Sequence, residues 1–179
     1  MVKVLFVCHG NICRSPMAEF VFRDMVEKAG LAGRFTAASA ATSREELGNP
    51  VYPPALRALA GCGIDTPALH RKTARQLTAA DYAAFDRLIG MDAANLRNMR
   101  RICGGDPQGK LSLLLDYTDR PGEVADPWYT GDFARTLRDV EAGCRGLLAQ
   151  LRGTAVRPCG GPLNQGFIYP RFLWVLIRK

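Results

Sequence analysis

A cysteine and an arginine lie six positions apart near the start of the chain, directly after an apolar run. Residues 4–7 predict a buried strand, which is followed by Cys8, a short loop and Arg14. The amides of such a loop can turn inward and, with the start of the next helix, bind a phosphate-sized anion. Arg14 adds a planar fork of N–H donors for two phosphate oxygens. Because the same positive groups stabilise a Cys8 thiolate, the spacing predicts a cysteine nucleophile beside a bound phosphate.

The residues between this cysteine and this arginine suit a tight anion-binding loop. Gly10 and Asn11 are the types that most readily adopt the positive φ angles that such a loop requires. Ser15 and Pro16 are typical of the start of a helix, where the Ser15 hydroxyl either caps the helix or points at Cys8 and stabilises its thiolate. The residues expected to bind the phosphate are His9, Gly10, Asn11, Ile12, Cys13 and Arg14.

The string C-H-G-N-I-C-R-S-P-M-A-E, residues 8–19, closely resembles the signature of the low-molecular-weight protein tyrosine phosphatases. The resemblance covers about residues 2–151. It implies an enzyme that hydrolyses phosphotyrosine, and small aryl phosphates, through a cysteinyl-phosphate intermediate and without a cofactor. The other segments that look like the family, in the family's order, are A-A-T-S at 40–43, G-N-P at 48–50, A-R-Q-L-T at 74–78, D-R-L-I-G-M-D-A-A-N-L at 86–96 and D-P-W-Y at 126–129.

Asp126 is the candidate proton donor for the leaving group. Pro127 restricts Asp126 to an extended conformation, and a departing phenolate needs an acid. On residues alone, Asp-Pro is usually a turn. The resemblance implies instead that Asp126 is the general acid and then the base that activates water. It also implies that Trp128 and Tyr129 form part of the pocket wall.

Cys13 has two interpretations. It could be a small residue packed within the loop. In the family, a cysteine at this position is associated with a disulfide that traps oxidised Cys8 and protects it from irreversible oxidation. Both interpretations stay open on the sequence.

Two residues of the family hold the loop asparagine in its strained conformation, a serine on the second strand and a histidine shortly before A-R-Q. Ser39 matches the serine that would support Asn11. Lys72 stands two residues before Ala74, and the nearest histidine is His70. Either a short insertion moves His70 into the supporting position or the support is remodelled.

The predicted mouth of the pocket departs from the family. Arg44 and Glu45 follow A-T-S, where the family often places an aromatic residue. We expect a charged pair in the pocket wall to alter peptide preference rather than chemistry. His9 either lies at the pocket rim and adds local positive potential, or is simply solvated.

The composition excludes several classes of site. Six cysteines and two histidines in 179 residues form no paired C-x-x-C sets, so neither a zinc site nor a disulfide framework is expected. Residues 154–179 hold four basic and no acidic side chains, so +3 of the formal net charge of +7 belongs to residues 1–153. No basic stripe with interleaved aromatics is present, and no nucleic-acid partner is expected. The predicted partner is a phosphotyrosine protein or peptide.

The N-terminus leads directly into the first strand and carries no signal-peptide pattern. A thiolate nucleophile needs a reducing compartment. We therefore expect a cytoplasmic protein without a membrane span.

Strand-like and helix-like segments alternate along the chain. Such alternation with short links predicts an α/β fold, a parallel sheet with helices on both faces. The resemblance implies four parallel strands, with the phosphate-binding loop after strand one, at the carboxyl edge where ligands bind in such sheets. The predicted strands are 3–7, 34–39, 85–91 and 111–115, and the predicted helices are 15–28, 55–60, 78–84, 93–101 and 133–151.

Residues 1–153 are expected to form the phosphatase domain, and the C-terminal tail, residues 154–179, breaks the pattern. Its apolar run F-L-W-V-L-I at 172–177 is far too short for a membrane span. Three interpretations compete: a disordered appendage, a strand or loop packed on the body, and an interfacial or partner-binding segment. The first interpretation is favoured, so the tail is expected to be disordered or only loosely packed.

Three rival functions share parts of the pattern. Arsenate reductases of this fold need further cysteines closely spaced in one segment, whereas Cys62 and Cys103 are far apart. Protein-arginine phosphatases carry a threonine at the position of Ile12, so Ile12 favours phosphotyrosine. A non-catalytic phosphate-binding module would need neither the thiol nor the acid, both of which are present.

Overall fold

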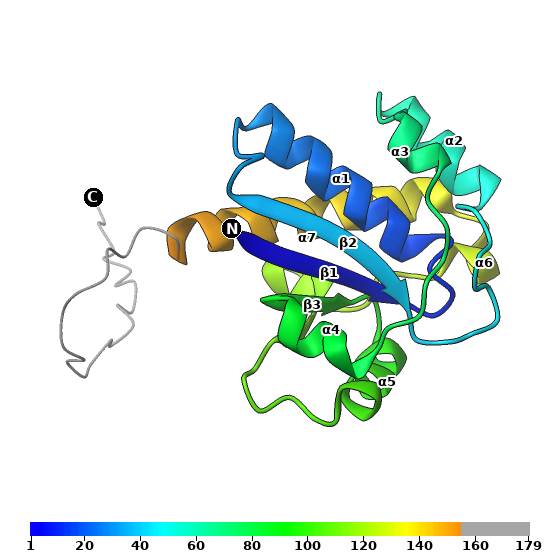
Figure 1. The fold of residues 1–179 in the computed structure, drawn as a ribbon. Coiled ribbons are helices and arrows are strands. Elements are labelled where there is room, and N and C mark those ends of the chain that lie inside the picture. Colours follow the sequence, from blue (N-terminus) through cyan, green and yellow to red (C-terminus); the bar gives the residue numbers. More distant parts are fainter. Residues whose placement is uncertain (155–179) are drawn as a thin grey trace, which may run out of the picture.

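A computed structural model describes residues 1–154 and shows one four-stranded sheet (Figure 1). The strands are β1 (Val2–Cys8), β2 (Phe35–Ala41), β3 (Arg87–Gly90) and β4 (Leu111–Leu113). They are all parallel and lie in the order β2-β1-β3-β4. The predicted parallel α/β fold is confirmed, and all strands end at the same edge of the sheet.

All five helices predicted from the sequence are present, with ends that differ from the predicted ones by up to three residues. They are α1 (Arg14–Lys28), α2 (Pro53–Gly61), α4 (Ala79–Ala84), α5 (Ala93–Cys103) and α7 (Phe133–Thr154). Sequence periodicity missed three single turns, because four residues are too few to show a period. These turns are α3 (Pro67–His70), the 3₁₀ helix η1 (Leu114–Tyr117) and α6 (Pro127–Thr130).

The central strand is buried on both faces, as expected for a parallel sheet covered by helices. Val4 and Phe6 point toward the core beneath α1 and α7, and Leu5 and Val7 point toward a second cluster beneath α5. All four side chains are fully buried. This packing fixes the end of β1 and therefore the start of the loop that follows Cys8.

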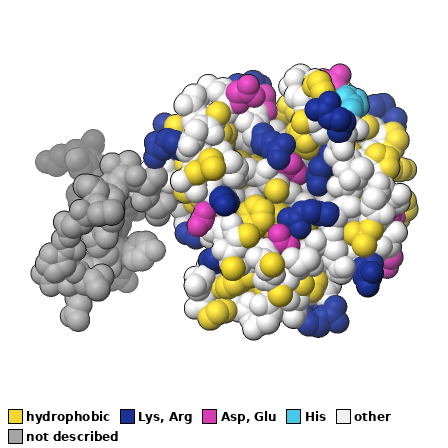
Figure 2. Space-filling model, viewed as in Figure 1, with side chains coloured by type: hydrophobic (Ala, Val, Ile, Leu, Met, Phe, Trp, Pro, Cys, Tyr) yellow, Lys and Arg dark blue, Asp and Glu magenta, His cyan; other side chains and the backbone are white. Residues whose placement is uncertain are grey.

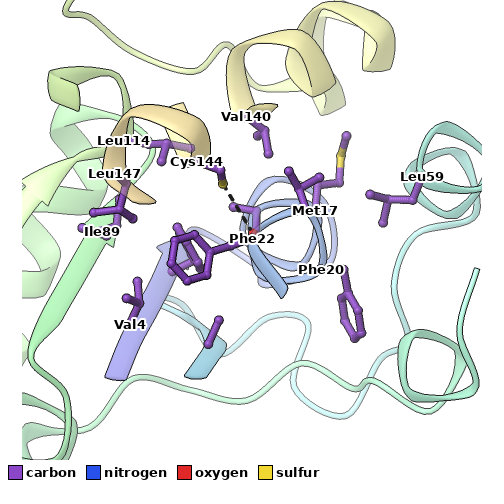
Figure 3. Packing of buried hydrophobic residues seen from close by; sticks show 14 of the residues in the cluster. Val4, Met17, Phe20, Phe22, Leu59, Ile89, Leu114, Val140, Cys144 and Leu147 are labelled. Atoms are coloured by element: carbon purple, nitrogen blue, oxygen red, sulfur yellow. Dashed lines mark hydrogen bonds between the residues drawn. The ribbon is translucent and has the colours of Figure 1, made fainter. Parts of the chain in front are cut away.

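The larger core holds α1 against α7 and the sheet (Figure 3). Phe22 and Met17 from α1 pack there with Leu147 from α7. Cys144 Sγ donates to the carbonyl of Ala18 at 3.6 Å, and burial raises the pKa of this thiol. Cys144 is therefore a core residue without access to substrate.

The surface on the face shown in Figure 2 carries basic and acidic side chains interspersed with apolar and neutral ones. None of the helices within residues 1–154 has the length and apolarity needed to cross a membrane. Helix α7 continues to Thr154, three residues beyond its predicted end. The predicted tail, residues 154–179, therefore begins within α7, and the rest of it, residues 155–179, lies outside the described part of the chain, so its three interpretations stay predictions.

Candidate active site

The loop between β1 and α1 lies at the carboxyl edge of the sheet (Figure 1). Cys8 is the last residue of β1, and Arg14 is the first residue of α1. Both line a cavity of about 350 Å³. Within residues 1–154, four amide N–H groups of the loop donate to no acceptor, and they belong to His9, Gly10, Ile12 and Cys13. The loop therefore presents free donors and the positive end of a 15-residue helix to an anion.

Of the two loop residues expected to adopt a positive φ angle, Gly10 and Asn11, only Asn11 does so. Asn11 has φ +59°, and no other non-glycine residue in the described chain has a positive φ. Gly10 has no positive φ, so that expectation was wrong. Gly10 is needed for space instead, since a Cβ there would lie 2.9 Å from Cγ of Glu46.

Hydrogen bonds hold Asn11 in this left-handed conformation. Its Nδ2 donates to Ser39 Oγ and to Ser15 Oγ, both at 2.8 Å. Its Oδ1 accepts from the backbone N–H of Arg75 at 3.2 Å. The surroundings thus hold Asn11 in a conformation that asparagine tolerates better than most other non-glycine residues.

Two donors face the sulfur of Cys8. The backbone N–H of Asn11 lies 3.3 Å from Sγ, and Ser15 Oγ lies 3.0 Å from it. Ser15 Oγ accepts from the Asn11 amide, and its own hydrogen has two acceptors nearby, Cys8 Sγ at 3.0 Å and the carbonyl of Ala40 at 3.5 Å, of which the sulfur is the closer. The N-cap of α1 is Cys13, so Ser15 points at Cys8 and does not cap the helix.

The histidine expected to support the loop does not reach it. His70 is exposed and bonds to Asp65 at 2.5 Å, so the insertion that would have moved it into place does not occur. Lys72 takes that place, with Nζ 3.3 Å from Asn11 Oδ1 and 3.4 Å from the carbonyl of Ser39. The support is therefore remodelled around a lysine.

A buried carboxylate lies behind this support. Glu19 is 2% exposed, and its Oε2 accepts from Ser39 Oγ at 2.6 Å. Two cations compensate its charge: Arg23 Nη2 at 2.7 Å and Lys72 Nζ at 3.8 Å. Burial lowers the pKa of Lys72, and the negative charge of Glu19 partly offsets that effect.

The guanidinium of Arg14 is held by two carboxylates. Nη1 donates to Asp92 Oδ2 at 2.6 Å and to the carbonyl of Val124 at 3.3 Å, and Nη2 binds Asp126 Oδ2. Arg14 is 3% exposed. Burial lowers its pKa, but the negative charges of Cys8, Asp126 and Asp92, with the hydrogen bond to Asp92, together outweigh burial and raise it overall. Nη1 therefore has two partners, the Asp92 carboxylate and a backbone carbonyl, whereas Nη2 has Asp126 alone, and both carboxylates line the cavity.

Asp126 and the two aromatic residues after it lie together on the cavity. Asp126 is the N-cap of α6, where its Oδ1 accepts from the backbone N–H of Trp128 at 3.1 Å. Trp128 packs against Tyr52 with ring centroids 5.3 Å apart, and Tyr129 is 87% exposed. One wall of the cavity is thus aromatic and carries a carboxylate at its inner end.

The two loop cysteines line the same cavity. Cys13 is 5% exposed. Burial, followed by the negative charge of Cys8, raises the pKa of Cys13 to about 12. Cys13 is therefore a thiol at neutral pH, close to a candidate nucleophile.

The opposite wall differs in part from the prediction. Glu45 lines the cavity and bonds to His9 Nε2 at 3.0 Å, so His9 lies at the rim. Arg44 is absent from the lining, and Glu46 is present in its place. Sequence reasoning also missed Asp92, although a carboxylate directly after a strand and before a helical pattern is a signal for this edge of the sheet. Across residues 1–154, no group of three or more His, Cys, Asp or Glu side chains is arranged to hold a metal ion.

Comparisons with known proteins agree on one family. A family described as "Low molecular weight phosphotyrosine protein phosphatase" matches residues 3–156. The low molecular weight protein-tyrosine-phosphatase YfkJ of Bacillus subtilis is 40% identical over 154 residues, which are 85% of this chain and 97% of that protein. A Schizosaccharomyces pombe phosphatase of the same description is 46% identical over 134 residues, 73% of this chain and 83% of that protein. The crystal structure of YfkJ superposes with a TM-score of 0.82 at 39% identity, covering 86% of this chain and 96% of the other.

Proposed function

The chain belongs to the low molecular weight phosphotyrosine protein phosphatase family and is a protein-tyrosine phosphatase, and we propose that Cys8, Arg14 and Asp126 carry out its reaction. The observation that carries this assignment is the convergence of a thiol, a guanidinium and a carboxylate on one cavity lined by free amide donors. A phosphate-binding module would need only the amides and the guanidinium.

The nucleophile is the thiolate of Cys8. It attacks phosphorus, the S–P bond forms, and the bond between phosphorus and the tyrosine oxygen breaks. The contacts of Sγ with the Asn11 N–H and the Ser15 hydroxyl support this role, since donors of this kind stabilise a thiolate before attack and when it departs. Phosphoryl transfer passes through a loose transition state, so positioning and charge stabilisation supply most of the acceleration.

Phosphate binding is assigned to the loop from His9 to Arg14. The free amides of this loop and the start of α1 stabilise the equatorial oxygens. Arg14 contributes its Nε and Nη2 edge, because its Nη1 is already bonded to Asp92 and Val124. Phosphate then replaces Asp126 at Nη2 and frees that carboxylate for proton transfer.

The general acid is Asp126. It gives a proton to the departing phenolate and later removes one from the water that cleaves the cysteinyl-phosphate. A dianion at the loop favours the protonated form of a neighbouring carboxylate, so substrate binding prepares the acid. The aromatic wall formed by Trp128 and Tyr129 favours an aryl phosphate over a shorter serine phosphate. Ile12 in the cavity lining, where protein-arginine phosphatases carry a threonine, agrees with phosphotyrosine.

Cys13, with Ser39 and Lys72 as supports, completes the assignment. Oxidised Cys8 forms a disulfide with Cys13, which lines the same cavity. The catalytic unit is residues 1–153, since every residue assigned here lies within it, and residues 154–179 are outside it. A phosphotyrosine protein or peptide is the substrate, and the reducing conditions that a thiolate needs support a cytoplasmic location.

Hydrolysis of p-nitrophenyl phosphate, phosphotyrosine and phosphoarginine, and reduction of arsenate, should be measured for the wild type and for Cys8→Ser. We expect turnover of both aryl phosphates and its loss in the variant, because a serine hydroxyl without an adjacent base stays un-ionised. A variant that kept a tenth of the wild-type rate would refute the nucleophile. Preferred turnover of phosphoarginine or arsenate would refute the substrate class.

A further inference from the structure

Charges of opposite sign lie on opposite sides of the cavity mouth. Strand β1, which leads into the phosphate loop, lies between β2 and β3 in the sheet. The segment after β2 and helix α5 after β3 therefore flank the loop on its two sides. Both contribute to the cavity lining, the first through Glu45 and Glu46 and the second through Ala94 and Asn98.

The β2 side is acidic. Glu45 has a side chain that is 73% exposed, and its bond to His9 leaves the carboxylate accessible to solvent. Glu46 bonds to the amide of Asn49 at 2.7 Å, a neutral partner that leaves its charge uncompensated. Arg44 precedes this pair but does not line the cavity.

The α5 side is basic. The helix sequence A-A-N-L-R-N-M-R-R-I-C holds three arginines and no acid. Arg97 lines an adjoining cavity of about 390 Å³ that shares Arg14, Asp92, Ala94 and Asp126 with the first and is also lined by Glu123, so the acids there lie toward the start of the helix. Arg101 Nη2 bonds to Oδ1 of Asn98, a residue of the main cavity wall, at 3.3 Å.

These two arginines share the helix face that borders the cavity, since residues three and four apart on a helix are neighbours. Both are exposed, and among residues 1–154 neither Arg97 nor Arg101 forms an ion pair. Their charges are thus available to a ligand that crosses the mouth. The charge of the third arginine, Arg100, contributes to lowering the pKa of Asp106, which does not line the cavity.

We propose that the enzyme selects phosphotyrosine segments with oppositely charged flanks, the basic flank against Glu45 and Glu46 and the acidic flank against Arg97 and Arg101. The inference rests on the proposed function, because it assumes that phosphotyrosine occupies the loop between these walls. A segment with flanks of one sign meets a like charge on one wall. A segment with opposite flanks in the correct order meets an opposite charge on both.

The test uses four phosphotyrosine peptides of equal length that differ only in the two residues on each side of the phosphotyrosine. Two peptides carry lysines on one side and aspartates on the other, in either order, and two carry four lysines or four aspartates. We expect one of the mixed peptides to have the highest kcat/KM and its reverse the lowest, about tenfold apart, since each exposed charge contact contributes only a few-fold. The difference should shrink at high salt.

Charge-reversed variants identify the wall responsible. With Arg97→Glu/Arg101→Glu both walls are acidic, so the four-lysine peptide should become the best substrate while turnover of p-nitrophenyl phosphate stays within about twofold. The control is Arg87→Glu/Arg100→Glu, which makes the same change in net charge away from the cavity. It should leave the order of the four peptides unchanged.

Equal kcat/KM for the two mixed peptides, or a single-sign peptide as the best wild-type substrate, would overturn the inference while hydrolysis continued. An unchanged order of peptides in the Arg97→Glu/Arg101→Glu variant would overturn the assignment to α5. If the enzyme hydrolysed none of the peptides and none of the aryl phosphates, the proposed function would be overturned, and the inference with it.

Discussion

Removal of the Asp126 carboxylate should weaken catalysis and strengthen phosphate binding at the same time. Asp126 Oδ2 binds Nη2 of Arg14, which is one of the donors that we propose for a phosphate oxygen. In Asp126→Ala this donor is free and a negative charge beside the anion site is gone. The same variant lacks the proton donor for the leaving group. Binding and turnover are therefore expected to change in opposite directions.

The magnitudes follow from the burial of the pair. A hydrogen bond to a charged group contributes about 1.5–3 kcal/mol, and the lower value applies because the side chain of Asp126 is 23% exposed. About 1.5 kcal/mol corresponds to an approximately tenfold lower Kd for inorganic phosphate. Loss of the general acid lowers kcat by about 10²–10⁴-fold for a leaving group that needs protonation.

Titration calorimetry with inorganic phosphate gives Kd, and a series of aryl phosphates with leaving groups of different acidity gives the dependence of kcat. Asp126→Asn separates the two effects, because its amide oxygen still accepts weakly from Arg14 but its side chain cannot donate as a carboxylic acid. We expect phosphate affinity to rise in the order wild type, Asp126→Asn, Asp126→Ala. Both variants should lose most activity on the poorest leaving groups. Asp119→Ala, which removes an exposed loop carboxylate, controls for net charge.

Two results would refute this reasoning. Unchanged or weaker phosphate binding in Asp126→Ala would mean that Asp126 does not compete for Arg14. Equal losses of kcat across leaving groups of all acidities would remove Asp126 from the role of general acid, whatever happened to binding.

Four further predictions concern the two loop cysteines, the loop support and the tail. At neutral pH iodoacetamide should alkylate Cys8 long before Cys13, whose pKa of about 12 keeps it a thiol, and peptide mapping that found equal labelling would contradict this. Mild peroxide should inactivate the enzyme reversibly by forming a Cys8–Cys13 disulfide, which mass spectrometry can detect. If a thiol reactivated the Cys13→Ser variant as fully as the wild type, Cys13 would not protect Cys8 from irreversible oxidation. Lys72→Met removes a donor to Asn11 and a partner of Glu19. It should therefore lower the free energy of unfolding by about 1–3 kcal/mol in urea titrations and also lower the affinity for phosphate. Wild-type values for both quantities would refute the role of Lys72 as a support. Truncation after Gly153 should leave kcat/KM on p-nitrophenyl phosphate within about twofold, because the proposed catalytic residues all precede that point, and a larger loss would place the tail in the catalytic unit.

The features predicted well from sequence were those set by local pattern. The alternation of apolar strands and amphipathic helices gave the parallel sheet, and the string from Cys8 to Arg14 gave the position of the loop at its carboxyl edge. Asp126, which the structure places at the cavity, was proposed as the acid because its D-P-W-Y context resembles a family segment. Each strand, helix and motif among these signals is recognised from a short stretch of neighbouring residues.

The features that sequence missed depend on contacts between distant segments. Asp92 reaches Arg14 across 78 positions, and Lys72 reaches Asn11 across 61. Neither pairing has a periodic or local signature. The wrong expectation for Gly10 has the same origin. Gly10 does not adopt positive φ, and its missing side chain leaves space for Glu46, which lies 36 positions away in the sequence.

The hydrogen bonds behind the loop have a direction that explains why a carboxylate is buried beside a phosphate site. Asn11 Nδ2 has two hydrogens and gives one to Ser39 and one to Ser15, so each hydroxyl must direct its own hydrogen elsewhere. Ser39 gives it to Glu19, and Ser15 has Cys8 Sγ within 3.0 Å. The acceptor at Glu19 therefore fixes the orientation of the amide, and the oriented amide leaves the Ser15 hydrogen for the sulfur. We infer that Glu19 orients the donors at the proposed nucleophile through this chain of hydrogen bonds, without lining the cavity itself.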